Sequence, residues 1–205
     1  MVRGRGPQDR VIAVKRVSTD IVGLGLIGFS VNCLMVVFNT IGIEKKDTDK
    51  LAGGWGLAHL SLGAMMVLVG VATFMNDPVA VPNLPAISGF FGIALVFYGF
   101  FWVFLGASLV RGADLRPIGH VSIGFAIVDL WFLNSSLKFT ALTGGKYVSL
   151  TILLVVLTVV FFVLYAGVHG KAVAFKVNAV LLIILALLGF YLAFSLIYPG
   201  GYVPF

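Results

Sequence analysis

The chain has 205 residues, of which 60% are hydrophobic and 11% are charged, and its formal net charge is +6. A soluble domain has roughly 25% charged residues, so this composition leaves too little polar surface to cover a water-facing globule. Lipid is therefore expected to surround most of the exterior. The basic residues are scattered singly through short loops apart from an N-terminal cluster, so we expect contacts with anionic lipid headgroups and no nucleic-acid partner.

Apolar segments long enough to cross a bilayer follow one another along the chain. A transmembrane helix needs about 20 apolar residues, and backbone polar groups in hydrocarbon must bond within the segment. The sequence therefore predicts an all-α membrane protein with six transmembrane helices. The expected helices are residues 21–43, 53–75, 86–110, 117–138, 147–168 and 172–197.

One transmembrane domain, residues 21–198, is expected to occupy most of the chain. A basic tail (residues 1–20) precedes it, and a short tail (residues 199–205) follows it. The first apolar run continues for a full span, which favours a retained helix over a cleaved signal peptide. Lysine and arginine counts balance on the two sides, and the basic tail beside the first helix favours cytoplasmic termini. We expect a multi-pass protein of the plasma (inner) membrane.

Four of the expected helices carry polar or small side chains at helical spacing along one face. These faces either line a narrow path together or hydrogen-bond neighbouring helices, which is common without any transport role. The sets are Gly25, Phe29, Asn32 and Asn39; His59, Gly63, Met66 and Gly70; Ser122, Asp129 and Ser136; and Tyr147, Thr151, Thr158 and Tyr165.

Asp129 is the one carboxyl group deep in an expected span. A charge at the bilayer centre is costly, so such residues usually face the bundle interior or a water path. Two interpretations stay open for Asp129, a structural hydrogen bond to another helix and a proton-linked role in transport. His59 is a second candidate for the proton-linked role.

Gly92, Gly99 and Gly106 repeat every seven residues along the third expected helix. The repeat predicts a groove in which another helix approaches closely, from the same chain or from a neighbouring subunit. No phosphate-binding loop, dinucleotide fingerprint or zinc motif is present, and the histidines are too dispersed for a metal site. We therefore expect no enzyme activity, no cofactor and no metal, and we interpret the single cysteine, Cys33, as a packing residue.

Three short strings occur in order in the first, third and fifth expected helices. Residues 24–29 read Leu-Gly-Leu-Ile-Gly-Phe, residues 94–102 read Ala-Leu-Val-Phe-Tyr-Gly-Phe-Phe-Trp, and residues 149–151 read Ser-Leu-Thr. These strings resemble those of the acetate uptake transporter family, also called succinate–acetate permeases. Ile21 and Gly23 stand where the family has two signature prolines, so the chain resembles a distant member.

The resemblance implies six helices around a pore in each subunit, with the subunits assembled as a homo-oligomeric, hexameric ring. It also implies a hydrophobic constriction formed by Phe29, Tyr98 and Leu150. Three bulky side chains would narrow a path to the width of a short acid, and the Tyr98 hydroxyl is expected to hydrogen-bond a carboxylate. The other residues expected along the pathway are Asn32, Asn39, Trp102 and Thr151.

The expected function is a channel or transporter for a small monocarboxylate such as acetate. No lysine or arginine lies deep in an expected span, and desolvating a bare carboxylate costs far more than desolvating the protonated acid. Permeation is therefore expected with a proton or as the neutral acid. Two alternatives stay open, a channel for small neutral solutes such as urea, short amides or ammonia, and a membrane scaffold without transport.

Overall fold

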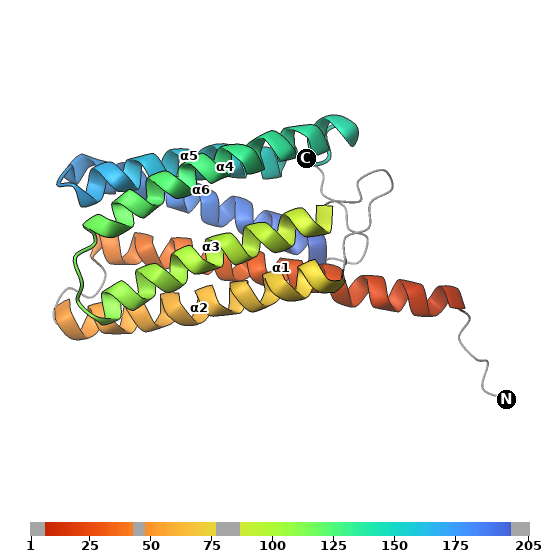
Figure 1. The fold of residues 1–205 in the computed structure, drawn as a ribbon, viewed down its shortest axis with the longest axis horizontal. Helices are drawn as coiled ribbons and strands as arrows, with labels where there is room; N and C mark the ends of the chain where they lie inside the picture. Colours follow the sequence, from red (N-terminus) through yellow and green to blue (C-terminus); the bar gives the residue numbers. More distant parts are fainter. Residues whose placement is uncertain (1–6, 43–47, 77–86, 198–205) are drawn as a thin grey trace.

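The computed structural model describes residues 7–42, 48–76 and 87–197, with described side chains in 21–42, 52–76 and 87–197. The helices in these ranges are α1 (Pro7–Ile41), α2 (Thr48–Asn76), α3 (Ile87–Val110), α4 (Arg116–Leu142), α5 (Val148–Val168) and α6 (Ala172–Ile197) (Figure 1). Each contains a segment long and apolar enough to cross a membrane. The prediction of an all-helical membrane protein with six such helices is confirmed for the described residues.

Helix α1 begins at Pro7, well before residue 21, and its first part projects beyond the other helices (Figure 1). Part of the segment expected as a basic tail is therefore helical. Proline suits the first turn of a helix, and no glycine or proline interrupts residues 8–22. The expected C-terminal tail (199–205) and the expected helix ends at residues 43 and 86 lie outside the described residues.

Helix α4 continues past Lys138, where the charge predicts its end, and stops at Leu142. A lysine can bury its stem against apolar surface while its ammonium group reaches water, so this charge need not end the helix. The chain turns at Gly144 and Gly145, whose φ angles are +64° and +98°. That left-handed backbone favours glycine and commonly follows a helix.

The helices form a closed ring in chain order. Each packs against its neighbours in sequence, and α1 packs against α6 to complete the circuit. The contact between α2 and α3 is the most extensive, and that between α3 and α4 is the least extensive of the neighbouring pairs. Every helix contributes buried side chains to the inside of the ring.

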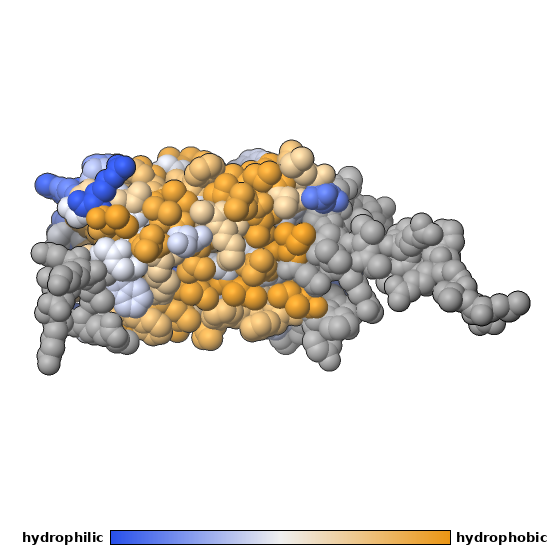
Figure 2. All heavy atoms as spheres, turned by 90° about the horizontal axis from the view of Figure 1, so that it is seen from below, coloured by the Kyte–Doolittle hydropathy of each residue, from blue (hydrophilic) through white to orange (hydrophobic). Residues whose placement is uncertain are grey.

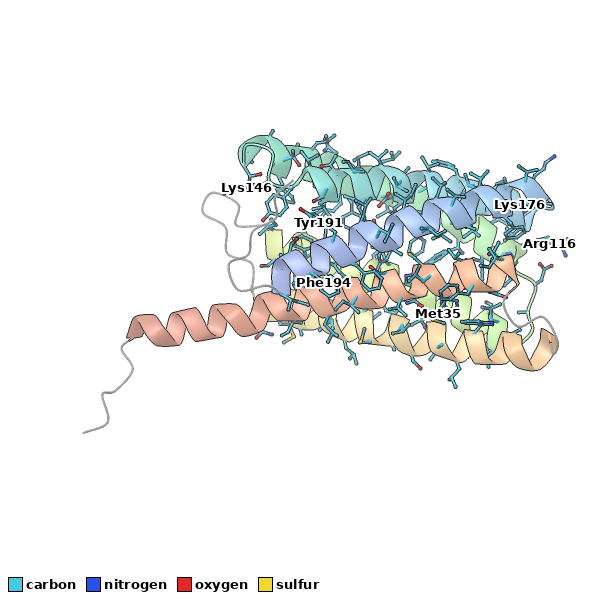
Figure 3. The ribbon with its side chains drawn as sticks, turned by 180° about the vertical axis from the view of Figure 1, so that it is seen from behind. Met35, Arg116, Lys146, Lys176, Tyr191 and Phe194 are labelled. Atoms are coloured by element: carbon cyan, nitrogen blue, oxygen red, sulfur yellow. The ribbon has the colours of Figure 1, made fainter. Side chains whose placement is uncertain are left out.

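The outer surface is apolar around its middle and carries charge near its ends. Figure 2 shows an apolar band across one face, with hydrophilic side chains towards the ends. Lys146 lies near one end of the bundle, whereas Arg116 and Lys176 lie near the other (Figure 3). An apolar belt with charged ends is the surface that a bilayer-spanning bundle needs.

Helices α2 and α3 approach so closely that only glycine fits at their contact. A Cβ atom on Gly63 would lie 2.7 Å from the backbone nitrogen of Val103 and 2.8 Å from the carbonyl oxygen of Gly99. Backbone atoms cannot move aside as a flexible side chain can, so the small residues allow the approach. The same contact is built by Gly56, Gly70, Gly92 and Gly106. The groove expected on the third helix is therefore occupied by α2 of the same chain.

Aromatic rings fill the seam between α3 and α4. Phe97 stacks on Phe125 with 4.0 Å between ring centroids, and Phe90 meets Phe132 edge to face at 5.4 Å. Such pairs contribute about 0.5–1.5 kcal/mol beyond the burial of their area. Side chains rather than close backbones therefore hold this side of the ring together.

Candidate functional site

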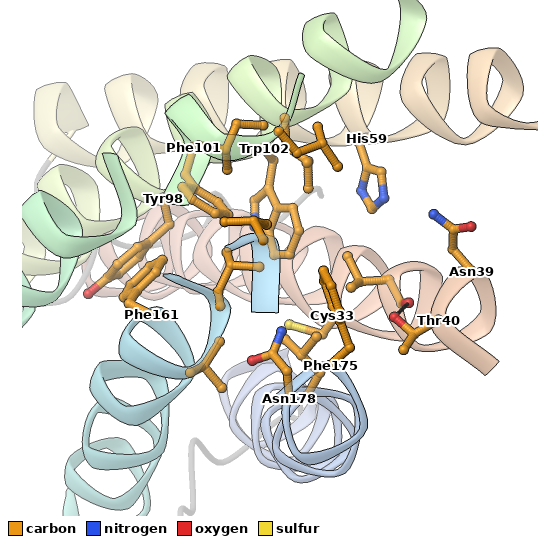
Figure 4. Close-up of a pocket in the computed structure, with 18 of the residues that line it drawn as sticks. Cys33, Asn39, Thr40, His59, Tyr98, Phe101, Trp102, Phe161, Phe175 and Asn178 are labelled. Carbon is orange, nitrogen blue, oxygen red and sulfur yellow. Dashed lines mark hydrogen bonds between the residues drawn. The ribbon is translucent and has the colours of Figure 1, made fainter. Parts of the chain in front are cut away.

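Within the ring lies a partly open cavity of about 110 Å³, lined by residues from all six helices (Figure 4). No lysine, arginine, aspartate or glutamate is among the described residues that line it. Its walls are mostly aromatic and aliphatic, with polar groups from His59, Trp102, Asn178, Asn39 and Thr40. We refer to it as the larger cavity.

A second, smaller cavity of about 30 Å³ lies among Leu26, Met66 and further apolar residues of α1, α2, α3 and α5. Phe29, Tyr98 and Leu157 line both cavities, so these three side chains form the partition between them. Two interior spaces that share a wall of three bulky residues resemble a path interrupted by a constriction.

The constriction residues expected from sequence lie close together inside the ring. Phe29, Tyr98 and Leu150 are all buried and all line the smaller cavity, and the rings of Phe29 and Tyr98 are 6.3 Å apart between centroids. Leu150 does not line the larger cavity, whereas Leu157 lines both. The partition thus includes Leu157, two helical turns after Leu150 on the same face of α5.

Asp129 is fully buried and is held by hydroxyl groups from two other helices. Tyr98 on α3 donates to its Oδ1 atom, and Thr158 on α5 donates to its Oδ2 atom. Asp129 therefore makes hydrogen bonds to other helices, as the structural interpretation of this residue expects. It lines neither of the two cavities.

The Tyr98 hydroxyl does not have the role expected for it. Its single hydrogen is donated to Asp129 instead of being available to a carboxylate in the pathway. A phenol has one hydrogen to donate, so Tyr98 presents mainly its ring to the cavities. The reason is the burial of Asp129, whose acceptor atoms need partners.

His59 and Asn32 form a buried polar pair between α2 and α1. Their Nδ1 and Oδ1 atoms are 2.7 Å apart, and the His59 ring stacks on Trp102 with 5.4 Å between centroids. Asn32 also places its amide nitrogen 4.0 Å from the sulfur of Met66. Of these residues His59 and Trp102 line the larger cavity, whereas Asn32 supports them from behind.

The expected pathway residue Thr151 lies elsewhere. Its hydroxyl is 3.2 Å from that of Ser136 and 3.0 Å from that of Thr140, both on α4. It lines neither cavity. Ser122 likewise donates to the carbonyl oxygen of Phe161 on α5, 2.9 Å away. The polar faces of α4 and α5 are therefore used to bind these two helices to each other, as hydroxyl groups often are in membranes.

Asn178 on α6 was missed by sequence reasoning. It is 3% exposed and lines the larger cavity opposite His59 and Trp102 (Figure 4). The single amide of this mostly apolar span was the available signal, because polar residues in a span tend to face the bundle interior. Within the described ranges, no group of three or more possible metal ligands comes together.

A scan against protein-family models and a search of curated proteins find no match for the chain. Fold and surface define it as a multi-pass helical membrane protein. That class is compatible with a channel or transporter.

Proposed function

We propose that the protein lets a short monocarboxylic acid such as acetic acid cross the membrane, with a proton or as the neutral acid. The observation that supports the proposal is the pair of interior cavities that share Phe29, Tyr98 and Leu157 as their common wall. A path of this kind admits a solute only a few atoms wide after modest side-chain motion.

The lining favours an uncharged solute. Among the residues that the structure describes, none that lines either cavity is formally charged, so a carboxylate would lose its hydration there without a compensating cation. Desolvating an ion costs far more than desolvating a neutral polar group. The protonated acid, whose fraction rises as pH falls, is therefore the form that we propose to permeate.

The resemblance to acetate uptake transporters supports the same proposal and motivates three others. We propose a transport rather than an enzymatic role, assembly as a homo-hexamer, and a place in the plasma membrane with both termini in the cytoplasm.

A neutral polar solute such as urea, a short amide or ammonia is the second candidate. The donation of the Tyr98 hydrogen to Asp129 favours it, because the partition then offers a carboxylate no hydrogen-bond donor from that hydroxyl. Asn178 lines the larger cavity and its Oδ1 atom has no partner among the described residues, so it is the acceptor that we propose for an amide or urea N–H group.

Flux into proteoliposomes tests both candidates. Labelled acetate, urea, acetamide and ammonia are compared in one preparation at two pH values. At roughly pH 5 the protonated acid is common, and at roughly pH 8 it is rare. Acetate flux that rises at the lower pH supports the first candidate, and pH-independent amide or urea flux supports the second. Acetate flux that stays equal at the two values contradicts passage of the neutral acid, and no flux of any solute favours a scaffold.

A further inference from the structure

Three residues that line the larger cavity each carry a buried polar atom without a partner. The atoms are His59 Nε2, Trp102 Nε1 and Asn178 Oδ1, and none has a hydrogen-bond partner among the described residues. Their side chains are 1%, 4% and 3% exposed. Leaving a buried polar group unpaired costs about 1–3 kcal/mol, so three such atoms on residues around one cavity favour a small molecule there as their partner.

The direction of each hydrogen bond follows from the neighbouring groups. Asn32 Oδ1 can only accept, so the 2.7 Å contact requires that His59 Nδ1 carries the hydrogen. In a neutral imidazole the other nitrogen is then an acceptor, so Nε2 of His59, which has no partner among the described residues, can accept a hydrogen bond. The indole N–H of Trp102 can only donate, and Asn178 Oδ1 can only accept.

We propose that His59, Trp102 and Asn178 form a binding site in the larger cavity for an uncharged carboxyl or carboxamide group. The O–H of an acid or one N–H of an amide is donated to His59 Nε2, and Trp102 donates to the carbonyl oxygen. An amide has a second N–H for Asn178, whereas an acid does not. A carboxylate ion has no hydrogen to donate, so it would face two acceptors with one donor.

The space suits a small molecule of this class. A single water needs about 10–15 Å³ of comparable volume, so about 110 Å³ accommodates a two- or three-carbon solute with room for water. Phe29 and Phe161 provide apolar wall for a methyl or ethyl group, and burying each CH₂ contributes about 0.8 kcal/mol. The site deepens the proposed function and rests on it for its biological role.

Equilibrium binding separates this site from transport. The chain has three tryptophans, so the indole N–H resonance of Trp102, assigned with Trp102→Phe, can be followed in nanodiscs. Acetamide and acetate are titrated at about pH 7, and acetic acid at about pH 5 against a probe-free sample at that pH. We expect a saturable Trp102 shift with acetamide, with acetic acid or with both, on the order of millimolar affinity, and none with acetate. The arm that responds identifies the group bound.

Variants test the two acceptors. Asn178→Leu should weaken acetamide binding about tenfold and change acetic acid binding less than about twofold. His59→Phe keeps a ring against Trp102 and should weaken both at least tenfold. Asn134→Leu, at an exposed position of α4, is the matched control. If His59→Phe does not fold, the titrations of the wild type and of Asn178→Leu still test the proposed site.

Three results would each overturn the site. The first is the absence of a saturable Trp102 shift with either neutral probe, which leaves water alone in the cavity. The second is binding of acetate as tight as that of acetamide, and the third is binding of acetamide by Asn178→Leu that equals that of the wild type. Binding without flux contradicts the proposed function and leaves the site intact. Flux without a Trp102 response contradicts the site alone.

Discussion

Replacing Asp129 by asparagine should leave the fold nearly as stable as before. The Thr158 hydroxyl lies 2.9 Å from the Leu154 carbonyl oxygen and 2.5 Å from Asp129 Oδ2, yet it has one hydrogen. A neutral Asp129 could donate its own hydrogen to Thr158, which frees the threonine hydrogen for Leu154, while Tyr98 donates to Oδ1. An asparagine amide can make the same set of bonds, because it has both a donor and an acceptor.

Alanine at position 129 should behave differently. It leaves the hydroxyl of Tyr98, a side chain only 6% exposed, without its partner. An unsatisfied buried group costs about 1–3 kcal/mol, and interhelical hydrogen bonds in membranes average about 0.6 kcal/mol. We expect Asp129→Ala to lose about 1–2 kcal/mol and Asp129→Asn to lose less than about 0.5 kcal/mol.

Unfolding in mixed detergent micelles, followed by circular dichroism, measures both variants. Tyr98→Phe removes the hydrogen-bond donor, so Asp129→Ala should lower the free energy of unfolding by less in that background. The double-mutant cycle then measures the coupling free energy between the two side chains. Equal loss in Asp129→Asn and Asp129→Ala would refute the reasoning, because it would mean that an ionised carboxylate is needed.

Three further outcomes follow from packing and from the cavities. Gly63→Ala should lose about 1–3 kcal/mol through overpacking against α3, whereas Gly54→Ala, whose Cβ would meet nothing within 4 Å, should not destabilise the protein in the same unfolding assay. Leu150→Ala should raise butyrate flux several-fold relative to acetate in proteoliposomes, while Leu187→Ala, 64% exposed on α6, should leave that ratio unchanged. Because Asp129 lines neither cavity, Asp129→Asn should retain the wild-type pH dependence of acetate flux, and its loss would restore the proton-linked interpretation.

The site was only partly predictable. His59, Trp102 and Asn39 line the larger cavity, and Phe29, Tyr98 and Leu150 surround the smaller one. Thr151 was selected by the same helical spacing, yet it belongs to a hydroxyl cluster between α4 and α5. Spacing identifies which residues share a face of one helix, and it carries no information on which neighbour that face meets.

The six apolar spans were determined by the sequence alone, although α1 begins earlier and α4 ends later than the sequence predicts. Runs such as residues 147–168 have no charge and are long enough to span a bilayer, and hydrocarbon leaves the backbone no alternative to internal hydrogen bonds. The third-helix glycines likewise predicted a close approach before its partner was known.

Only the tertiary structure decided what the polar side chains do. These helices are apolar on nearly every side, so the contrast between a core face and a water face that orients a soluble helix is missing. The hydrogen bond between Tyr98 and Asp129 depends on how the six helices pack. The same packing places both His59 and Asn178 at the larger cavity. Those contacts join residues far apart in the chain, and no local pattern encodes them.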